Sequence, residues 1–181
     1  MSAKREGAGA TMSGREFILG MGLSVIDPTK GRVALPAALR NSIIANNSLP
    51  GVMDTRTFFL GQHPTEKCLV GYDRDQMATL LQRITDAEND EGRAAGDRVG
   101  YDHELRRRQF ARFEQVPLDP SGRFTISKKL RRWGHLEDMA FVQGLGDLIE
   151  IWNPHRMLAD PDVPDYQKQD CRDEMEERGL L

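Results

Sequence analysis

The sequence lacks most features of a secreted or membrane-bound protein. Its 181 residues include only two cysteines, Cys68 and Cys171, far apart along the chain. This spacing predicts free thiols in a reducing cytoplasm rather than a disulfide framework. No stretch approaches the ~20 apolar residues that a membrane-spanning helix needs. The apolar run at residues 17–26 contains two glycines and ends in Asp27 and Pro28, so it predicts a strand rather than a secretory signal. We therefore expect a cytoplasmic protein with no membrane partner.

The usual catalytic and metal-binding motifs are also missing. The chain contains no H-E-x-x-H, no paired C-x-x-C and no G-x-S-x-G. The four histidines are isolated, so a zinc site has no support. Two G-x-G fragments, at residues 20–22 and 144–146, lack the third glycine and the strand-to-helix context of a dinucleotide-binding loop. We expect no catalytic residue, no metal, no cofactor and no small-molecule substrate.

The formal net charge of -3 is spread unevenly. Residues 160–181 hold eight acidic and three basic side chains, a balance of -5, which leaves +2 on residues 1–159. The window at residues 123–132 holds five cations and no acid. The overall charge therefore understates the cationic character of the rest of the chain, which is compatible with a nucleic-acid partner.

Two short segments about 90 residues apart are nearly the same, Asp27-Pro-Thr-Lys-Gly-Arg32 and Asp119-Pro-Ser-Gly-Arg123. In such a segment the aspartate oxygen caps nearby amides, proline presets φ for a type I turn, and glycine relieves crowding at the exit. The first segment is one residue longer, so we expect it to close as a type I turn with a glycine bulge. Both predict a tight, projecting loop whose arginine begins a strand.

The similarity of the two halves extends beyond these loops. The corresponding segments are residues 31–35 and 122–126, residues 39–40 and 130–131, and residues 69–73 and 149–153. The offset is 91 for the first two pairs and 80 for the third. Both halves read as turn, strand, short helix, strand and strand. This order predicts two similar units, each with an incomplete sheet that the other covers.

A helical connection is predicted between the units. A helix begins at Asp73, because Gln76 stands three residues later as in a capping box and apolar residues follow at helical spacing. A polar stretch at residues 86–96 is predicted to end it. A second helix is predicted at about residues 97–113, with the arginines at 106–108 on a solvated face or an intersubunit surface.

These segments in this order resemble the MraZ family over residues 17–160. MraZ proteins are bacterial and fuse two SpoVT/AbrB domains. The resemblance implies an α+β, β-dominated fold, a pseudo-twofold swapped-hairpin (double-split) β-barrel from two AbrB-like repeats, with an inserted helical pair and short flanking helices. The expected divisions are a disordered arm at 1–14, a first repeat at 15–75, connecting helices at 76–112, a second repeat at 113–160, and an acidic, partly helical C-terminal tail at 161–181.

The resemblance also implies a function. MraZ proteins are sequence-specific transcriptional regulators without enzymatic activity, mainly repressors of the bacterial division and cell-wall gene cluster. They bind direct repeats in double-stranded promoter DNA as ring homo-oligomers of eight or twelve subunits. The family therefore implies a cytoplasmic, nucleoid-associated protein with DNA and its own copies as partners.

The candidate DNA-binding residues fall into two groups. The family's Asp-to-Arg signature carries over to Asp27 and Arg32, and to Asp119 and Arg123. To these we add cations near the loops and short helices, expected to contact phosphates or bases, namely Lys30, Arg40, Lys128, Lys129 and Arg131. Simpler interpretations compete with both groups, because the aspartates can pair with arginine to hold a hairpin's register and the lysine-rich cluster can be a solvated helix face.

Alternative functions remain at this stage. An AbrB-type antitoxin or another AbrB-like transition-state regulator would share the DNA-binding barrel. Such antitoxins usually carry one copy of the unit, whereas this chain has two. A ring-forming scaffold without DNA affinity is a further alternative, which retention on heparin or binding to the DNA upstream of its own gene would test.

Overall fold

The computed structural model describes residues 14–48, 54–95 and 104–181, so the arm expected at residues 1–14 lies almost entirely outside the described residues. The elements of the first half are β1 (Ile18–Val25), β2 (Arg32–Ala34), α1 (Ala37–Asn46), β3 (Thr57–Gln62) and β4 (Leu69–Tyr72). The connecting helices are α2 (Arg74–Ala95) and α3 (Glu104–Phe110). The elements of the second half are β5 (Phe113–Pro117), β6 (Arg123–Thr125), α4 (Lys128–Gly134), β7 (Met139–Gly146), β8 (Ile149–Trp152), α5 (Pro154–Ala159) and α6 (Asp165–Glu177).

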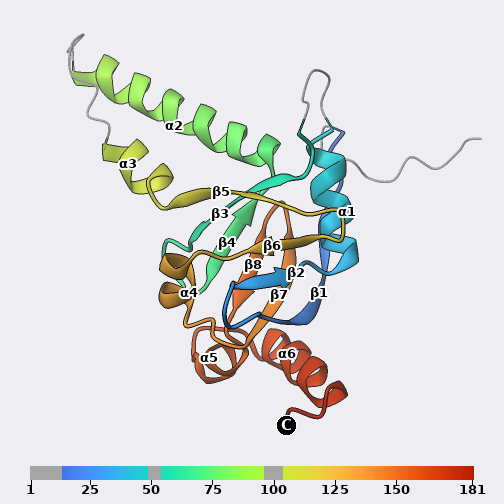
Figure 1. Ribbon diagram of the computed structural model, residues 1–181. Helices are drawn as coiled ribbons and strands as arrows, with labels where there is room; N and C mark the ends of the chain where they lie inside the picture. Colours follow the sequence, from blue (N-terminus) through green and yellow to red (C-terminus); the bar gives the residue numbers. More distant parts are fainter. Residues whose placement is uncertain (1–13, 49–53, 96–103) are drawn as a thin grey trace, which may run out of the picture.

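The strands form two antiparallel sheets. The larger has six strands in the order β1-β7-β8-β4-β3-β5, and the smaller is a ribbon of β2 and β6. Figure 1 shows the ribbon in front of the larger sheet, with α2 extending away at one end and α5 and α6 at the other. The expected α+β class, rich in strands, is confirmed.

The two halves of the chain complete each other's sheets. Strand β1 of the first half pairs with β7 of the second, from Ile18 opposite Gly146 to Val25 opposite Met139. Strand β5 of the second half pairs reciprocally with β3 of the first. Strands β4 and β8, and β2 and β6, also pair across the halves. The first strand of each half therefore lies against the third strand of the other.

The main hydrophobic core lies between the ribbon and the larger sheet. The inward side chains of the ribbon, Val33 and Phe124, belong to one cluster with Leu39 of α1 and Leu130 of α4. The Phe124 ring meets Phe58 of β3 edge-on, with ring centroids 5.0 Å apart and an interplanar angle of 86°. Because one face of the ribbon is packed in this way, its other face points outward.

A second cluster lies beneath α5 and α6. It joins Leu23 of β1 and Trp152 of β8 to Cys171 and Met175 of α6. The Glu174 carboxylate accepts a hydrogen bond from the backbone N–H of Leu23 at 3.1 Å. The acidic C-terminal segment thus contributes apolar side chains to the core and satisfies a donor on an edge strand.

Both cysteines are free, as the sequence predicts, and both are buried. Burial raises the pKa of the Cys171 thiol to about 11 and raises that of Cys68 further. These thiols are therefore protonated at neutral pH, and protonated, buried thiols are poor nucleophiles.

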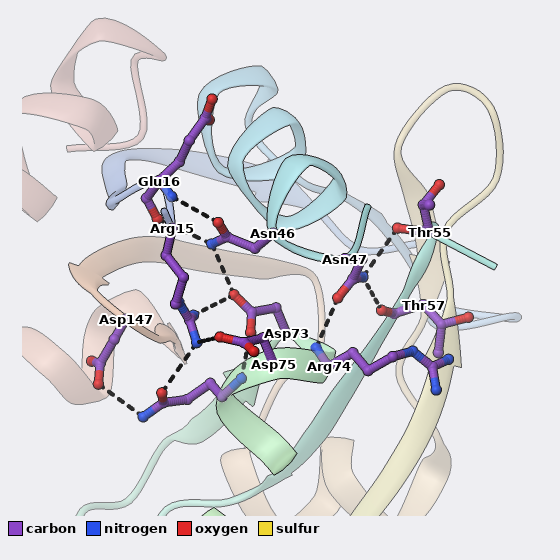
Figure 2. Close-up of polar contacts among 11 residues, drawn as sticks. Arg15, Glu16, Asn46, Asn47, Thr55, Thr57, Asp73, Arg74, Asp75 and Asp147 are labelled. Atoms are coloured by element: carbon purple, nitrogen blue, oxygen red, sulfur yellow. Dashed lines mark hydrogen bonds and ion pairs between the residues drawn. The ribbon is translucent and has the colours of Figure 1, made fainter. Parts of the chain in front are cut away.

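A buried polar network ties the start of β1 to the start of α2 (Figure 2). Arg15 Nη2 lies 2.6 Å from Asp73 Oδ2, and Arg15 Nη1 lies 2.8 Å from Asp75 Oδ2. Asn46, at the end of α1, donates to Asp73 Oδ2 at 2.9 Å. Asp73 Oδ1 accepts from the N–H of Gln76 at 2.8 Å, which is the predicted helix cap. Burial raises the pKa of Asp73, and the hydrogen bonds from Gln76 and Asn46 and the charge of Arg15 oppose that rise.

The connecting helices differ from the sequence prediction at their ends. Helix α2 runs to Ala95, so residues 86–95 of the polar stretch predicted to end the helix are part of it. Residue Phe113, predicted to be helical, begins β5 because it pairs with Gly61 of β3. Arg106 does not lie on a free helix face. Its Nε lies 2.7 Å from an oxygen of buried Glu88, so it joins α3 to α2.

Candidate nucleic-acid interface

The first Asp-to-Arg segment forms a closed loop at the end of β1. The Asp27 N–H donates to the carbonyl of Arg32 at 2.8 Å, and the Gly31 N–H donates to the carbonyl of Asp27 at 2.7 Å. Asp27 Oδ1 accepts from the N–H groups of Thr29 and Lys30, each at 2.8 Å. These two hydrogen bonds to the carboxylate lower the pKa of Asp27, and the one from Lys30 has the largest effect. The carboxylate therefore caps its own loop.

The second segment closes in the same way with one residue fewer. The Asp119 N–H donates to the carbonyl of Arg123 at 2.8 Å, and the Gly122 N–H donates to the carbonyl of Asp119 at 2.9 Å. Asp119 Oδ1 accepts hydrogen bonds from the N–H groups of Ser121 and Arg123. These hydrogen bonds lower the pKa of Asp119, and the one from Arg123 has the largest effect. The extra residue of the first loop is thus accommodated in the turn, while the Asp-to-Arg backbone bond is kept.

The two aspartates differ in their relation to the arginines. Asp119 Oδ2 accepts from Arg123 Nε at 2.8 Å, so this pair does bridge the loop as the simpler interpretation expects. Among the described residues, the Arg32 side chain has no hydrogen bond or ion pair. The longer first loop therefore leaves its arginine unpaired.

Each loop is also braced by an arginine from the other half. Arg131 Nη1 donates to the carbonyl of Pro28 in the first loop at 3.3 Å. Arg40 Nη1 donates to the carbonyl of Ser121 in the second loop at 3.4 Å. The two arginines occupy equivalent positions of the repeats, so the contact is reciprocal. Of the predicted DNA-binding residues, Arg40 and Arg131 are thus half-buried behind the loops.

The loop glycines make this brace possible. Gly31 and Gly122 have φ of +68° and +77°, in the left-handed region that favours glycine. A Cβ atom on Gly122 would lie 2.4 Å from Cδ of Arg40, and one on Gly31 would lie 2.7 Å from Nε of Arg131. Glycine is therefore favoured by the turn and by the close approach of the bracing arginine, and a Cβ on Gly31 would also lie 2.6 Å from the carbonyl oxygen of Ile126.

The ribbon carries the remaining signature residues outward. Arg32 lies opposite Thr125 and Ala34 lies opposite Arg123, and all four are exposed. Both arginines therefore stand on one face of the ribbon, and Lys30 is exposed at the adjoining loop. Ala34 and Thr125, which are not among the predicted DNA-binding residues, lie on the same face, and their alternation with buried neighbours is the signal in the sequence that indicates this position.

Lys128 and Lys129 lie at the start of α4, which follows β6 after two residues. Both side chains are exposed. Ser127 caps this helix, because its Oγ accepts from the N–H of Leu130 at 3.3 Å. The structure therefore brings Lys30, Arg32 and Arg123 together on the ribbon and its loop, and places these two lysines one short connection away.

Within residues 14–48, 54–95 and 104–181, no group of three or more His, Cys, Asp or Glu side chains could hold a metal ion. No helix in the same part of the chain is long and apolar enough to span a bilayer.

Comparison with known proteins identifies the family. No family model matches the chain. Among curated proteins, the transcriptional regulator MraZ of Roseiflexus sp. is 31% identical over 129 residues, which cover 70% of this chain and 75% of the relative. The MraZ of Roseiflexus castenholzii is 30% identical over the same coverage. That of Maridesulfovibrio salexigens is 27% identical over 156 residues, covering 83% of this chain and 89% of the relative. This chain therefore belongs to the MraZ family of transcriptional regulators.

Proposed function

We propose that this protein is a sequence-specific, DNA-binding transcriptional regulator, mainly a repressor of the bacterial division and cell-wall gene cluster. The observation that carries the proposal is the outward face of the β2–β6 ribbon, where Arg32 and Arg123 stand together above a packed apolar face. The relatives, all named as transcriptional regulators, support the same class of function.

The ribbon suits the major groove of duplex DNA. That groove admits a two-stranded β-ribbon, and arginine can donate two hydrogen bonds to a guanine edge, worth about 1 to 3 kcal/mol of discrimination. The Arg32 side chain makes no hydrogen bond or ion pair in the described part of the chain, so its guanidinium can donate to a base. Arg123 is oriented by Asp119, which leaves the outer nitrogens of its guanidinium to reach the DNA.

The remaining cations position the protein along the backbone. Lys30, Lys128 and Lys129 are exposed, and phosphate contacts by such side chains hold a protein in register without reading sequence. In this proposal Asp27 and Asp119 act indirectly by shaping the loops. Arg40 and Arg131 likewise support the loops from behind.

Oligomerisation completes the proposal. We infer a swapped-hairpin barrel in each chain, supported by the exchange of first strands between the halves. A ring of eight or twelve such chains would engage several direct repeats of a promoter at once. Linked contacts of this kind raise overall avidity by ~10²- to 10⁴-fold over a single contact. Such a ring would associate with the nucleoid.

Replacing Arg32 tests the proposal. Arg32→Ala should nearly abolish binding to the DNA upstream of the protein's own gene, measured by gel shift, because each subunit loses a base contact. Arg83→Ala, which removes an exposed cation from α2, is the matched control and should bind as the wild type does. The native mass should be the same for all three proteins. An Arg32→Ala variant that shifts this DNA at wild-type concentrations would refute the proposal.

A further inference from the structure

A second basic site lies outside the ribbon. A pocket of about 490 Å³ is lined by Lys129, Arg132 and Trp133 of α4, by Lys67 of the β3–β4 connection and by Arg156 of α5. His135 and Gln62 complete the lining. Neither Arg32 nor Arg123 lines this pocket. Its side chains come from both halves of the chain, so the folded protein assembles it.

The positive charge of this pocket is not compensated. The residues that line it include four lysines and arginines and no carboxylate. In the described part of the chain, none of these four side chains makes an ion pair or a side-chain hydrogen bond. Cations gathered in a concave site repel one another and attract anions. The lining therefore favours a ligand with several negative charges.

The pocket also contains an exposed aromatic ring. Trp133 is 44% exposed, whereas Trp152, the other tryptophan of the chain, is 2% exposed in the core. An exposed indole beside cations is suited to stack on a flat aromatic ring. The volume lies within the ~300 to 1,000 Å³ of typical small-molecule sites.

We propose that this pocket binds a nucleoside phosphate, with its base stacked on Trp133 and its phosphates among Lys67, Lys129, Arg132 and Arg156. Two sources share this chemistry, a free nucleotide and an unpaired nucleotide of a nucleic-acid strand. A base inside an intact duplex cannot offer its face to the indole. The pocket shares Lys129 with the proposed phosphate contacts to duplex DNA but contains neither Arg32 nor Arg123, so the inference does not rest on the function proposed for the ribbon.

Calorimetric titration of the full-length protein tests this inference with four probes: ATP, adenosine, inorganic triphosphate and a ten-nucleotide single-stranded oligoadenylate. ATP should bind more tightly than adenosine or triphosphate alone, and it should quench tryptophan fluorescence. Trp133→Ala should weaken ATP binding about tenfold or more and leave triphosphate binding unchanged. Arg132→Ala should weaken both ligands, while the distant Arg83→Ala should weaken neither. Tighter binding of the oligonucleotide than of ATP would assign the site to a strand.

Several results would overturn the inference. Equal affinity for ATP and triphosphate, insensitive to Trp133→Ala, would show a simple polyanion surface. Binding of a peptide with the acidic sequence of residues 165–181, without binding of any nucleotide probe, would instead assign the pocket to a second copy of this chain. Arg32→Ala should lose duplex binding and keep ATP binding, so failure of the ribbon proposal and failure of this one can be told apart. Because Trp133 is exposed, urea unfolding should show that its variants are folded.

Discussion

Replacing Arg131 separates two roles that a cation beside a DNA-binding loop can have. If Arg131 contacts a DNA phosphate, Arg131→Ala should reduce the salt dependence of DNA binding and leave the stability of the fold unchanged. If it braces the first loop, as its contact with the Pro28 carbonyl indicates, stability should fall and the salt dependence should not change. We expect the second outcome, and we expect Arg40→Ala to give the same result at the second loop.

The magnitude follows from the contacts. A hydrogen bond from a charged group contributes about 1.5 to 3 kcal/mol, and the 3.3 Å distance from Arg131 to the Pro28 carbonyl places this one near or below the lower figure. The Nε and Cζ atoms of Arg131 pack closely against Gly31, so the substitution also removes van der Waals contacts with the loop. The Nε of Arg131 is buried and, among the described residues, lacks a partner, which reduces the net gain. We therefore expect Arg131→Ala to lower the free energy of unfolding by about 1 to 2 kcal/mol.

Two measurements on the same variants decide the question. Urea unfolding gives the change in stability, and DNA affinity at several salt concentrations gives the slope of log K against log salt. Lys128→Ala is the matched control, because Lys128 is exposed at the start of the same helix. Its stability should change by less than about 0.5 kcal/mol, and its slope should fall by about 1 for a lost phosphate contact. A lower slope with unchanged stability for Arg131→Ala would refute the bracing role.

Two further predictions concern the ribbon and its loop. Phe124→Ala should lower the free energy of unfolding by about 3 to 5 kcal/mol in urea titration, because it removes a buried ring that packs on Phe58. Thr125→Ala, on the exposed face of the ribbon, should change the free energy of unfolding by less than about 0.5 kcal/mol. Similar losses of stability in both variants would contradict the assignment of the two ribbon faces. The pKa of Asp119 is lowered below 3.8, so its ionised form stabilises the fold above that pH and the contribution is lost as the pH falls through the lowered pKa. Asp119→Asn should therefore have a lower free energy of unfolding than the wild type at pH 7, and this difference should shrink below about pH 3.8. A difference in stability that is the same at pH 7 and below about pH 3.8 would contradict the ionic role of Asp119.

The loops could be predicted from the sequence because their determinants are local. An aspartate, a proline and a glycine within five or six residues specify the turn, and the structure shows the predicted aspartate caps in both copies. The alternation after each loop likewise specified which ribbon residues are buried. The cap of α2 at Asp73 was found for the same reason.

The positions of Arg40 and Arg131 could not be predicted in this way. Each side chain reaches a loop 81 or 103 residues away in the sequence, and no local pattern specifies that contact. The same limit applies to Phe113, where pairing with β3 prevails over the helical pattern that precedes it. It also applies to the acidic C-terminal segment, whose composition gives no sign that Cys171 and Met175 are fully buried. Contacts between distant segments decide all these cases.

The ribbon depends on both halves of the chain, and this dependence explains why the duplication matters for function. Strands β2 and β6 have three residues each, and a two-stranded ribbon this short is not stable alone in water. It is extended by two equivalent backbone bonds, from the N–H of Leu35 to the carbonyl of Gly122 and from the N–H of Ile126 to the carbonyl of Gly31, each at 2.9 Å. Each bond joins one half to the loop of the other. Neither half alone can therefore hold its loop, its brace and its arginine in the arrangement that the proposed DNA contact requires.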